Sequence, residues 1–122
     1  MVTDMKVNVL GTEYTIKRVN LDQDEYMEKM QFGGYCDNST KTITILNLKS
    51  TPEWKDESEE IIKQQESETI RHELIHAFLN ESGLRYNAFA AERSWATNEE
   101  MVDWIAIQFP KLIKAFRDAD AI

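Results

Sequence analysis

His72, Glu73 and His76 form the pattern HExxH, and both histidines of the chain belong to it. On an α-helix, side chains four residues apart lie on the same face, so both imidazoles can reach one metal ion. Glu73 directly follows His72, and its carboxylate can contact a water molecule at the metal without binding the metal itself. These residues predict two ligands of a zinc site and a general base. A chance match, or a histidine that only packs in a core, would predict no third ligand downstream.

Acidic residues at the start of a later helix are candidates for that third ligand. Thr97 and Glu100 have the spacing of a capping box, in which the Glu100 carboxylate turns back to the first amide of the helix. Glu99 is then left to bind metal. Asp103 lies four residues after Glu99 on the same face, so one can bind metal while the other accepts the N–H of a ligand histidine. A solvated acidic helix start is the alternative, and the choice between Glu99 and Glu100 stays open.

These motifs resemble those of the gluzincin metallopeptidases, of which thermolysin is a member. The resemblance consists of HExxH followed, after about two dozen residues, by NExxxD, formed here by Asn98, Glu99 and Asp103. It covers residues 69–103. The roles that it implies are zinc binding by His72, His76 and Glu99, general-base catalysis by Glu73, and orientation of the first ligand histidine by Asp103.

A second resemblance concerns the small size of the chain and the order of its elements. Two hairpins, an HExxH helix and an acidic helix are similar to the compact zincin-like proteins related to the ImmA/IrrE metallopeptidases, which phages and prophages often encode. The segment from Gly34 to Asp37 before a strand adds to this likeness. The expected fold is α+β: a minimal zincin-like domain over residues 1–122, with a small antiparallel sheet packed on the HExxH helix and a C-terminal helix.

The elements that must position the site begin with two predicted hairpins. Residues 5–10 alternate apolar and polar side chains, and residues 12–19 resume a β-type composition after Gly11. Residues 35–37 and 41–46 flank a polar turn and predict the second hairpin. A strand beside an active-site helix often pairs with an extended peptide, which adds one more strand to the sheet.

Two helices are predicted before the acidic one. A short helix ends near Gly33, and a long helix covers residues 58–82, with Gly83 as its stop signal. The second half of the long helix has an apolar side that we expect to be buried. That side consists of Ile70, Leu74, Ala77 and Phe78.

The acidic helix begins at Thr97, and Pro110 predicts a kink or a break in it. Its apolar residues recur every three or four positions, which places them on one face of a helix. They are Val102, Ile105, Phe109, Leu112 and Phe116. We expect the three tryptophans, Trp54, Trp95 and Trp104, to pack in the core or at hinges rather than in a substrate pocket.

Composition limits the classes of protein that need to be considered. With 122 residues, 42% of them hydrophobic, the chain has the size and composition of one globular domain. A net charge of -8 without a basic cluster argues against nucleic-acid binding, and no apolar run is long enough for a membrane helix. Cys36 is the only cysteine, so it has no disulfide partner in the chain, and we expect it to be a small buried residue. With no signal peptide at the start, a cytoplasmic protein is expected.

The function predicted from these residues is hydrolysis of a peptide or protein substrate by water that zinc activates. Thermolysin-like enzymes add a histidine or tyrosine that donates to the oxyanion, and this chain has no third histidine. The residues that can replace it are Tyr86, Arg93, Arg85 and Tyr35. One alternative is a zinc-stabilised, non-catalytic binding protein of a phage or prophage, against which the presence of Glu73 argues. Another is a zinc hydrolase acting on a non-peptide amide. The sequence does not indicate the oligomeric state.

Overall fold

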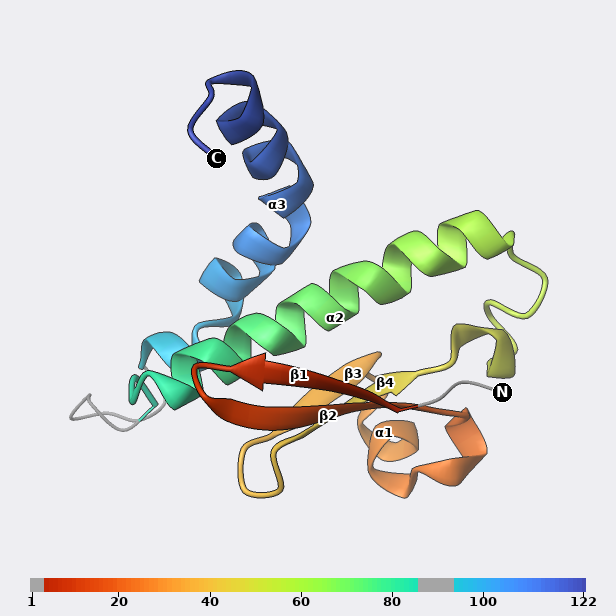
Figure 1. The fold of residues 1–122 in the computed structure, drawn as a ribbon. Helices are drawn as coiled ribbons and strands as arrows, with labels where there is room; N and C mark the ends of the chain where they lie inside the picture. Colours follow the sequence, from red (N-terminus) through yellow and green to blue (C-terminus); the bar gives the residue numbers. More distant parts are fainter. Residues whose placement is uncertain (1–3, 86–93) are drawn as a thin grey trace.

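The computed structural model describes residues 4–85 and 94–122, which form an α+β fold (Figure 1). Its main elements are β1 (Met5–Val9), β2 (Thr12–Val19), α1 (Glu25–Met30), β3 (Gly34–Asp37), β4 (Thr42–Leu46), α2 (Glu59–Glu81) and α3 (Glu99–Asp118). Short 3-10 helices also occur, namely η1 (Leu21–Gln23), η2 (Leu48–Ser50) and η4 (Trp95–Thr97). Both predicted hairpins and all three predicted helices are confirmed. Within the described ranges, no helix has the length and apolar character needed to cross a membrane.

The sheet has four strands in the order β1-β2-β4-β3. Each hairpin is antiparallel, but β2 and β4 pair in parallel, with Thr15 opposite Thr42 and Val19 opposite Leu46. The prediction of an antiparallel sheet is therefore wrong, because the sheet is mixed. A parallel pair needs a crossover connection, which α1 and β3 supply here. The pattern within each hairpin contains no signal for that long-range pairing.

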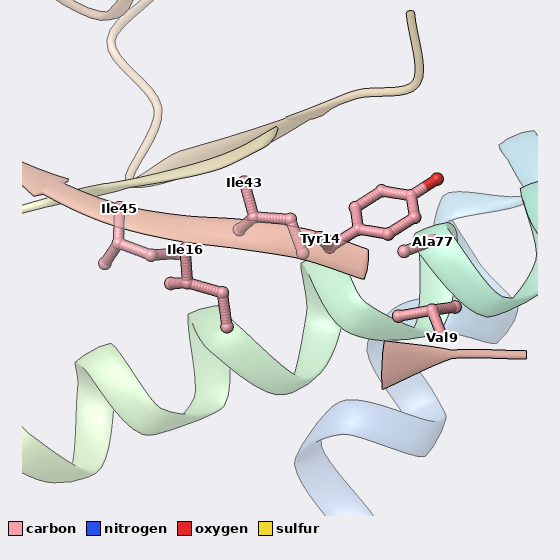
Figure 2. Packing of buried hydrophobic residues seen from close by; sticks show 6 residues of the cluster. All are labelled: Val9, Tyr14, Ile16, Ile43, Ile45 and Ala77. Carbon is pink, nitrogen blue, oxygen red and sulfur yellow. The ribbon is translucent and has the colours of Figure 1, made fainter. Parts of the chain in front are cut away.

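The main hydrophobic core lies between the sheet and the second half of α2, which runs across one face of the sheet (Figure 1). Figure 2 shows six buried members of this cluster, Val9, Tyr14, Ile16, Ile43, Ile45 and Ala77. A second cluster joins α1 to the start of α2 and consists of Met27, Leu46, Leu48 and Ile62. Trp54 packs against this second cluster, which confirms its predicted packing role.

Several aromatic side chains are more exposed than their spacing predicts. Trp95 and Trp104 are 62% and 56% exposed, so neither packs in the core, and their packing at a hinge stays a prediction. On the apolar face of α2, Ala77 is buried and Ile70 and Leu74 pack against the core as expected, but Phe78 is 42% exposed. On α3, Val102 is buried but Phe116 is exposed. Phe116 is exposed because only the first turns of α3 lie beside α2, while its C-terminal turns extend away from the rest of the described chain (Figure 1).

The turn between α1 and β3 brings β3 close to α2. α1 ends slightly before the predicted Gly33, because Gln31 adopts the left-handed conformation (φ 58°) and its N–H bonds back to the helix. Gly34 then permits a close approach, since a Cβ atom there would lie 2.8 Å from Cγ2 of Thr69. As a result β3, one of the two outer strands of the sheet, lies against the helix that carries the two histidines.

Candidate metal and catalytic site

The HExxH helix begins and ends where its sequence predicts. The Ser58 hydroxyl accepts a hydrogen bond from the amide of Ile61, and Gly83 follows the C-terminus with a φ of +83°. His72 and His76 are one turn apart on this continuous helix, and their ring centroids are 4.8 Å apart. The structure thus places both imidazoles side by side, as predicted.

Three potential ligand atoms converge at the histidines. Nε2 of His72 and Nε2 of His76 are 3.1 Å apart, and Oε1 of Glu99 lies 3.3 Å from the first and 2.5 Å from the second. Ligand atoms of a tetrahedral zinc site are roughly 3.3–3.6 Å apart, given bond lengths of about 2.0–2.2 Å. Two of the three distances are close to that range. The third is a hydrogen-bond distance, so a metal ion would require Glu99 to move by about 1 Å.

The other nitrogen of each imidazole has its own acceptor. Nδ1 of His76 lies 2.6 Å from the backbone carbonyl oxygen of Ala96, and Nδ1 of His72 lies 2.8 Å from Oδ1 of Asp103. A carbonyl or carboxylate oxygen accepts hydrogen bonds, so each Nδ1 carries a proton and donates it. In the neutral rings, both Nε2 atoms then present lone pairs to the carboxylate of Glu99. Three lone-pair atoms this close together require a cation or a shared proton between them.

The start of α3 determines which acidic residue reaches the histidines. Asn98, not Thr97, is the N-cap, and its side-chain oxygen accepts the amide of Met101 at 2.9 Å. The predicted capping box of Thr97 with Glu100 is therefore wrong, because the helix begins one residue later than that pairing requires. The Thr97 hydroxyl instead donates to the carbonyl of Ser94. Glu99, and not Glu100, points to the histidines in this arrangement.

Glu73 is a buried carboxylate beside this cluster. It is 7% exposed, and its Oε2 lies 4.0 Å from Nε2 of His72. Burial raises the pKa of Glu73, the two histidines oppose that rise, and the carboxylates of Glu99 and Asp103 add to it. Within the described residues its carboxylate accepts no hydrogen bond. His72, Glu73 and His76 form a group that could hold a metal ion, with Glu73 farther from the convergence point than Glu99.

A cleft of about 530 Å³ contains these side chains. α2, β3 and the first turn of α3 form its walls, and Tyr26 and Phe32 line one end. Cys36 on β3 also lines the cleft, is partly buried and packs against the main core. Burial raises the pKa of Cys36 to about 12, so it is a neutral thiol at physiological pH.

Two of the four candidates for oxyanion stabilisation, Tyr86 and Arg93, lie outside the described residues. The hydroxyl of Tyr35 donates to Oδ2 of Asp24 at 2.6 Å, so its proton is already engaged. Arg85 lines the same cleft as the histidines. Tyr35 lines this cleft as well, so both described candidates lie in the same cleft as the histidines.

Two contacts near the site were not predicted from the sequence. The Ala96 carbonyl that accepts from His76 is a backbone group, and no side-chain pattern indicates it. Nε of Arg71 donates to the carbonyl oxygen of Ala106 at 2.7 Å. The sequence does indicate the contact of Arg71 with Ala106. Pro110 has no N–H, so the carbonyl of Ala106, four residues earlier, lacks its usual donor within the helix.

Comparisons of the chain with protein-family models, with curated proteins and with solved structures give no match. The class of protein is therefore defined by its own features. They are an α+β fold with a four-stranded mixed sheet, and a group of His72, Glu73 and His76 that could hold a metal ion. Any more specific function must be argued from this geometry.

Proposed function

We propose that this protein is a zinc-dependent peptidase of the gluzincin type, with a zincin-like fold. In this proposal His72, His76 and Glu99 bind zinc, Glu73 is the general base and Asp103 orients His72. The observation that carries the proposal is the arrangement of the two imidazoles. Each donates from Nδ1 to a separate acceptor and directs Nε2 to the same point, as in metal sites whose ligand histidines are oriented by a further hydrogen bond.

The donor set agrees with zinc in a catalytic site. Two imidazole nitrogens and one carboxylate oxygen are a combination that binds zinc and leaves a fourth position open. Glu99 must widen its contact with His76 for this, and its side chain is 69% exposed, so no packing resists the movement. A structural zinc site would more commonly have four protein ligands.

Hydrolysis in this site would depend on Glu73. When bound, zinc would lower the pKa of a water molecule to about 7 and polarise the substrate carbonyl. Glu73 lies beside the convergence point, where its carboxylate would take a proton from the attacking water and would pass it to the leaving amine. Its raised pKa favours the first transfer, because the carboxylate then binds a proton more readily. In this proposal Arg85, which lines the cleft, donates to the oxyanion.

The sheet supports a peptide as the substrate. β3 pairs with β4 on one side only, and its residues line the cleft that contains the histidines. An extended peptide can add to such an outer strand through backbone hydrogen bonds. The scissile bond would then pass close to Glu73 and the two histidines.

The first test is metal binding. Purified protein should contain about one zinc ion per chain, and His72→Ala should abolish this. Zinc should raise the melting temperature of the wild type, because it binds only the folded chain. Gln64→Ala replaces an exposed residue of the same helix and should behave as wild type. A wild type without zinc, whose melting temperature zinc does not change, would refute the proposal.

The second test is hydrolysis by the zinc-loaded protein of an unbiased peptide library, with chelated protein as the control. Cleavage that requires zinc supports the peptidase. If the loaded protein cleaves no peptide but cleaves a non-peptide amide, the hydrolase alternative holds instead. If it binds a protein partner and cleaves nothing, the zinc-stabilised binding protein is favoured.

A further inference from the structure

The carbonyl of Ala106 has lost its usual partner inside α3. In an α-helix each carbonyl accepts the amide of the residue four positions later, and here that residue is Pro110, which has no N–H. Ala106 is 1% exposed, so water does not readily replace the missing donor. An unpaired buried carbonyl would cost free energy, and some other donor is therefore required.

Arg71 supplies that donor from α2. Its Nε donates to the Ala106 carbonyl oxygen at 2.7 Å, a short hydrogen bond from a charged group. Arg71 directly precedes His72, so the bond begins at the same turn of α2 as the metal site. The proline in α3 and the arginine in the HExxH segment thus form one structural unit.

This contact continues the series of polar contacts along the interface between α2 and α3. His76 contacts Glu99, His72 contacts Asp103, and Arg71 contacts Ala106. Glu99, Asp103 and Ala106 lie on one face of α3, since they are separated by four and three residues. Of the polar contacts between α2 and α3 in the described residues, the one to Ala106 lies farthest along α3. Beyond it α3 extends away from α2 (Figure 1).

We propose that Arg71 is a positioning residue for the metal site. By donating to the carbonyl that Pro110 leaves without a helical partner, it fixes the rotation and distance of α3 relative to α2. This holds Glu99 and Asp103 where they reach the two histidines. The inference rests on the proposed metal site, but it does not depend on hydrolysis.

The test is Arg71→Met, which keeps an unbranched apolar stem and removes the donor. Affinity for zinc, measured by competition with a chelator, should fall about 10-fold, the lower end of the loss expected when a direct hydrogen-bond partner of a metal ligand is removed, because Arg71 acts on the ligands only through α3. In the metal-free protein, the nitrogen NMR signals of His72 should lose the pattern of a proton held on Nδ1. Lys111→Met removes the same charge from an exposed position on α3 and should change neither measurement.

Pro110→Ala makes the test specific, because it restores an amide that can donate to Ala106 within α3. In that background Arg71→Met should reduce zinc affinity less than it does in the wild type, a coupling that a double-mutant cycle measures. An equal reduction in both backgrounds would overturn the inference, as would an Arg71→Met protein with unchanged affinity and unchanged His72 signals.

Two further outcomes keep the inference separate from the proposed function. If Arg71→Met does not fold, Arg71→Lys retains the cation with different donor geometry, and an affinity equal to that of the wild type would contradict the role of Nε. If the wild type binds no zinc, the proposed function fails. The NMR signals of His72 in metal-free Arg71→Met still decide whether Arg71 positions α3.

Discussion

Glu73 and Glu81 lie about two turns apart on α2 and have opposite surroundings. Glu73 is buried beside the histidines, accepts no hydrogen bond within the described residues, and burial raises its pKa. Glu81 accepts from three donors, Nζ of Lys41 at 2.8 Å, the hydroxyl of Tyr14 at 2.6 Å and the hydroxyl of Thr12 at 2.9 Å. These donors, Lys41 first, lower the pKa of Glu81 to about 2.

The contrast separates a carboxylate suited to chemistry from one suited to structure. The lone pairs of Glu81 are occupied, and its contacts tie the end of α2 to β2 and to the turn before β4. A carboxylate stabilised in this way is a poor proton acceptor. Glu73 has an available carboxylate in a cleft, and a raised pKa at such a place is typical of functional groups.

The largest expected effect is on hydrolysis. Glu73→Gln should reduce the rate by about 10² to 10⁴-fold, because it removes the proton acceptor, while zinc content stays at the wild-type level. Glu81→Gln should keep the wild-type rate per folded molecule and lower only the melting temperature. Rates on a substrate from the peptide library, together with zinc content, check both. Cleavage that persists in Glu73→Gln would mean that the base is misassigned, and equal losses in both variants would remove the contrast.

The next effect concerns zinc affinity and the two adjacent acids at the start of α3. Glu99→Ala should weaken binding by more than the 10 to 100-fold expected for Asp103→Asn, because a ligand contributes more than a partner of a ligand. Glu100→Ala is the matched control and should leave affinity unchanged, since this exposed side chain does not point to the histidines. Chelator competition measures all three. A loss in Glu100→Ala alone would move the third ligand to Glu100.

A smaller effect is the dependence of stability on pH. The pKa of Glu81 is about 2 in the folded chain, below its ordinary value of 4.5. Its contribution to stability is therefore complete above about pH 4.5 and is lost as the pH falls toward 2. Urea unfolding of the metal-free wild type and of Glu81→Gln should show a difference in unfolding free energy that shrinks over this interval. A difference that does not vary with pH would show that Glu81 acts through packing.

The sequence predicted the elements of the site because local signals specify them. HExxH lies on a helix with a clear N-cap at Ser58 and a stop at Gly83, and the structure brings Glu99 and Asp103 to the predicted histidines. The capping box failed because Thr97 and Asn98 are both good N-caps, and only the packed structure selects between them.

Other features depend on contacts between distant segments. The parallel pairing of β2 and β4 is set by the path of the chain between them, not by alternation within either strand. Glu81 resembles an ordinary surface acid in the sequence, because its three donors come from positions 12, 14 and 41. Trp104 is 56% exposed, since burial of an apolar side chain on α3 depends on whether a distant segment packs against it.

The smallest expected effects are on the free energy of unfolding, and they compare two of the residues that donate hydrogen bonds to Glu81. Lys41 lowers the pKa of Glu81 most, yet Tyr14→Phe should destabilise the fold more than Lys41→Met. Tyr14 is fully buried, so water does not readily replace the hydrogen bond that its hydroxyl donates to Glu81. The side chain of Lys41 is 38% exposed, and ion pairs in such positions contribute about 0–1 kcal/mol. Unfolding free energies in urea measure both, with the exposed Tyr26→Phe as control. The reverse order would mean that charge, and not burial, determines how firmly this end of α2 is held.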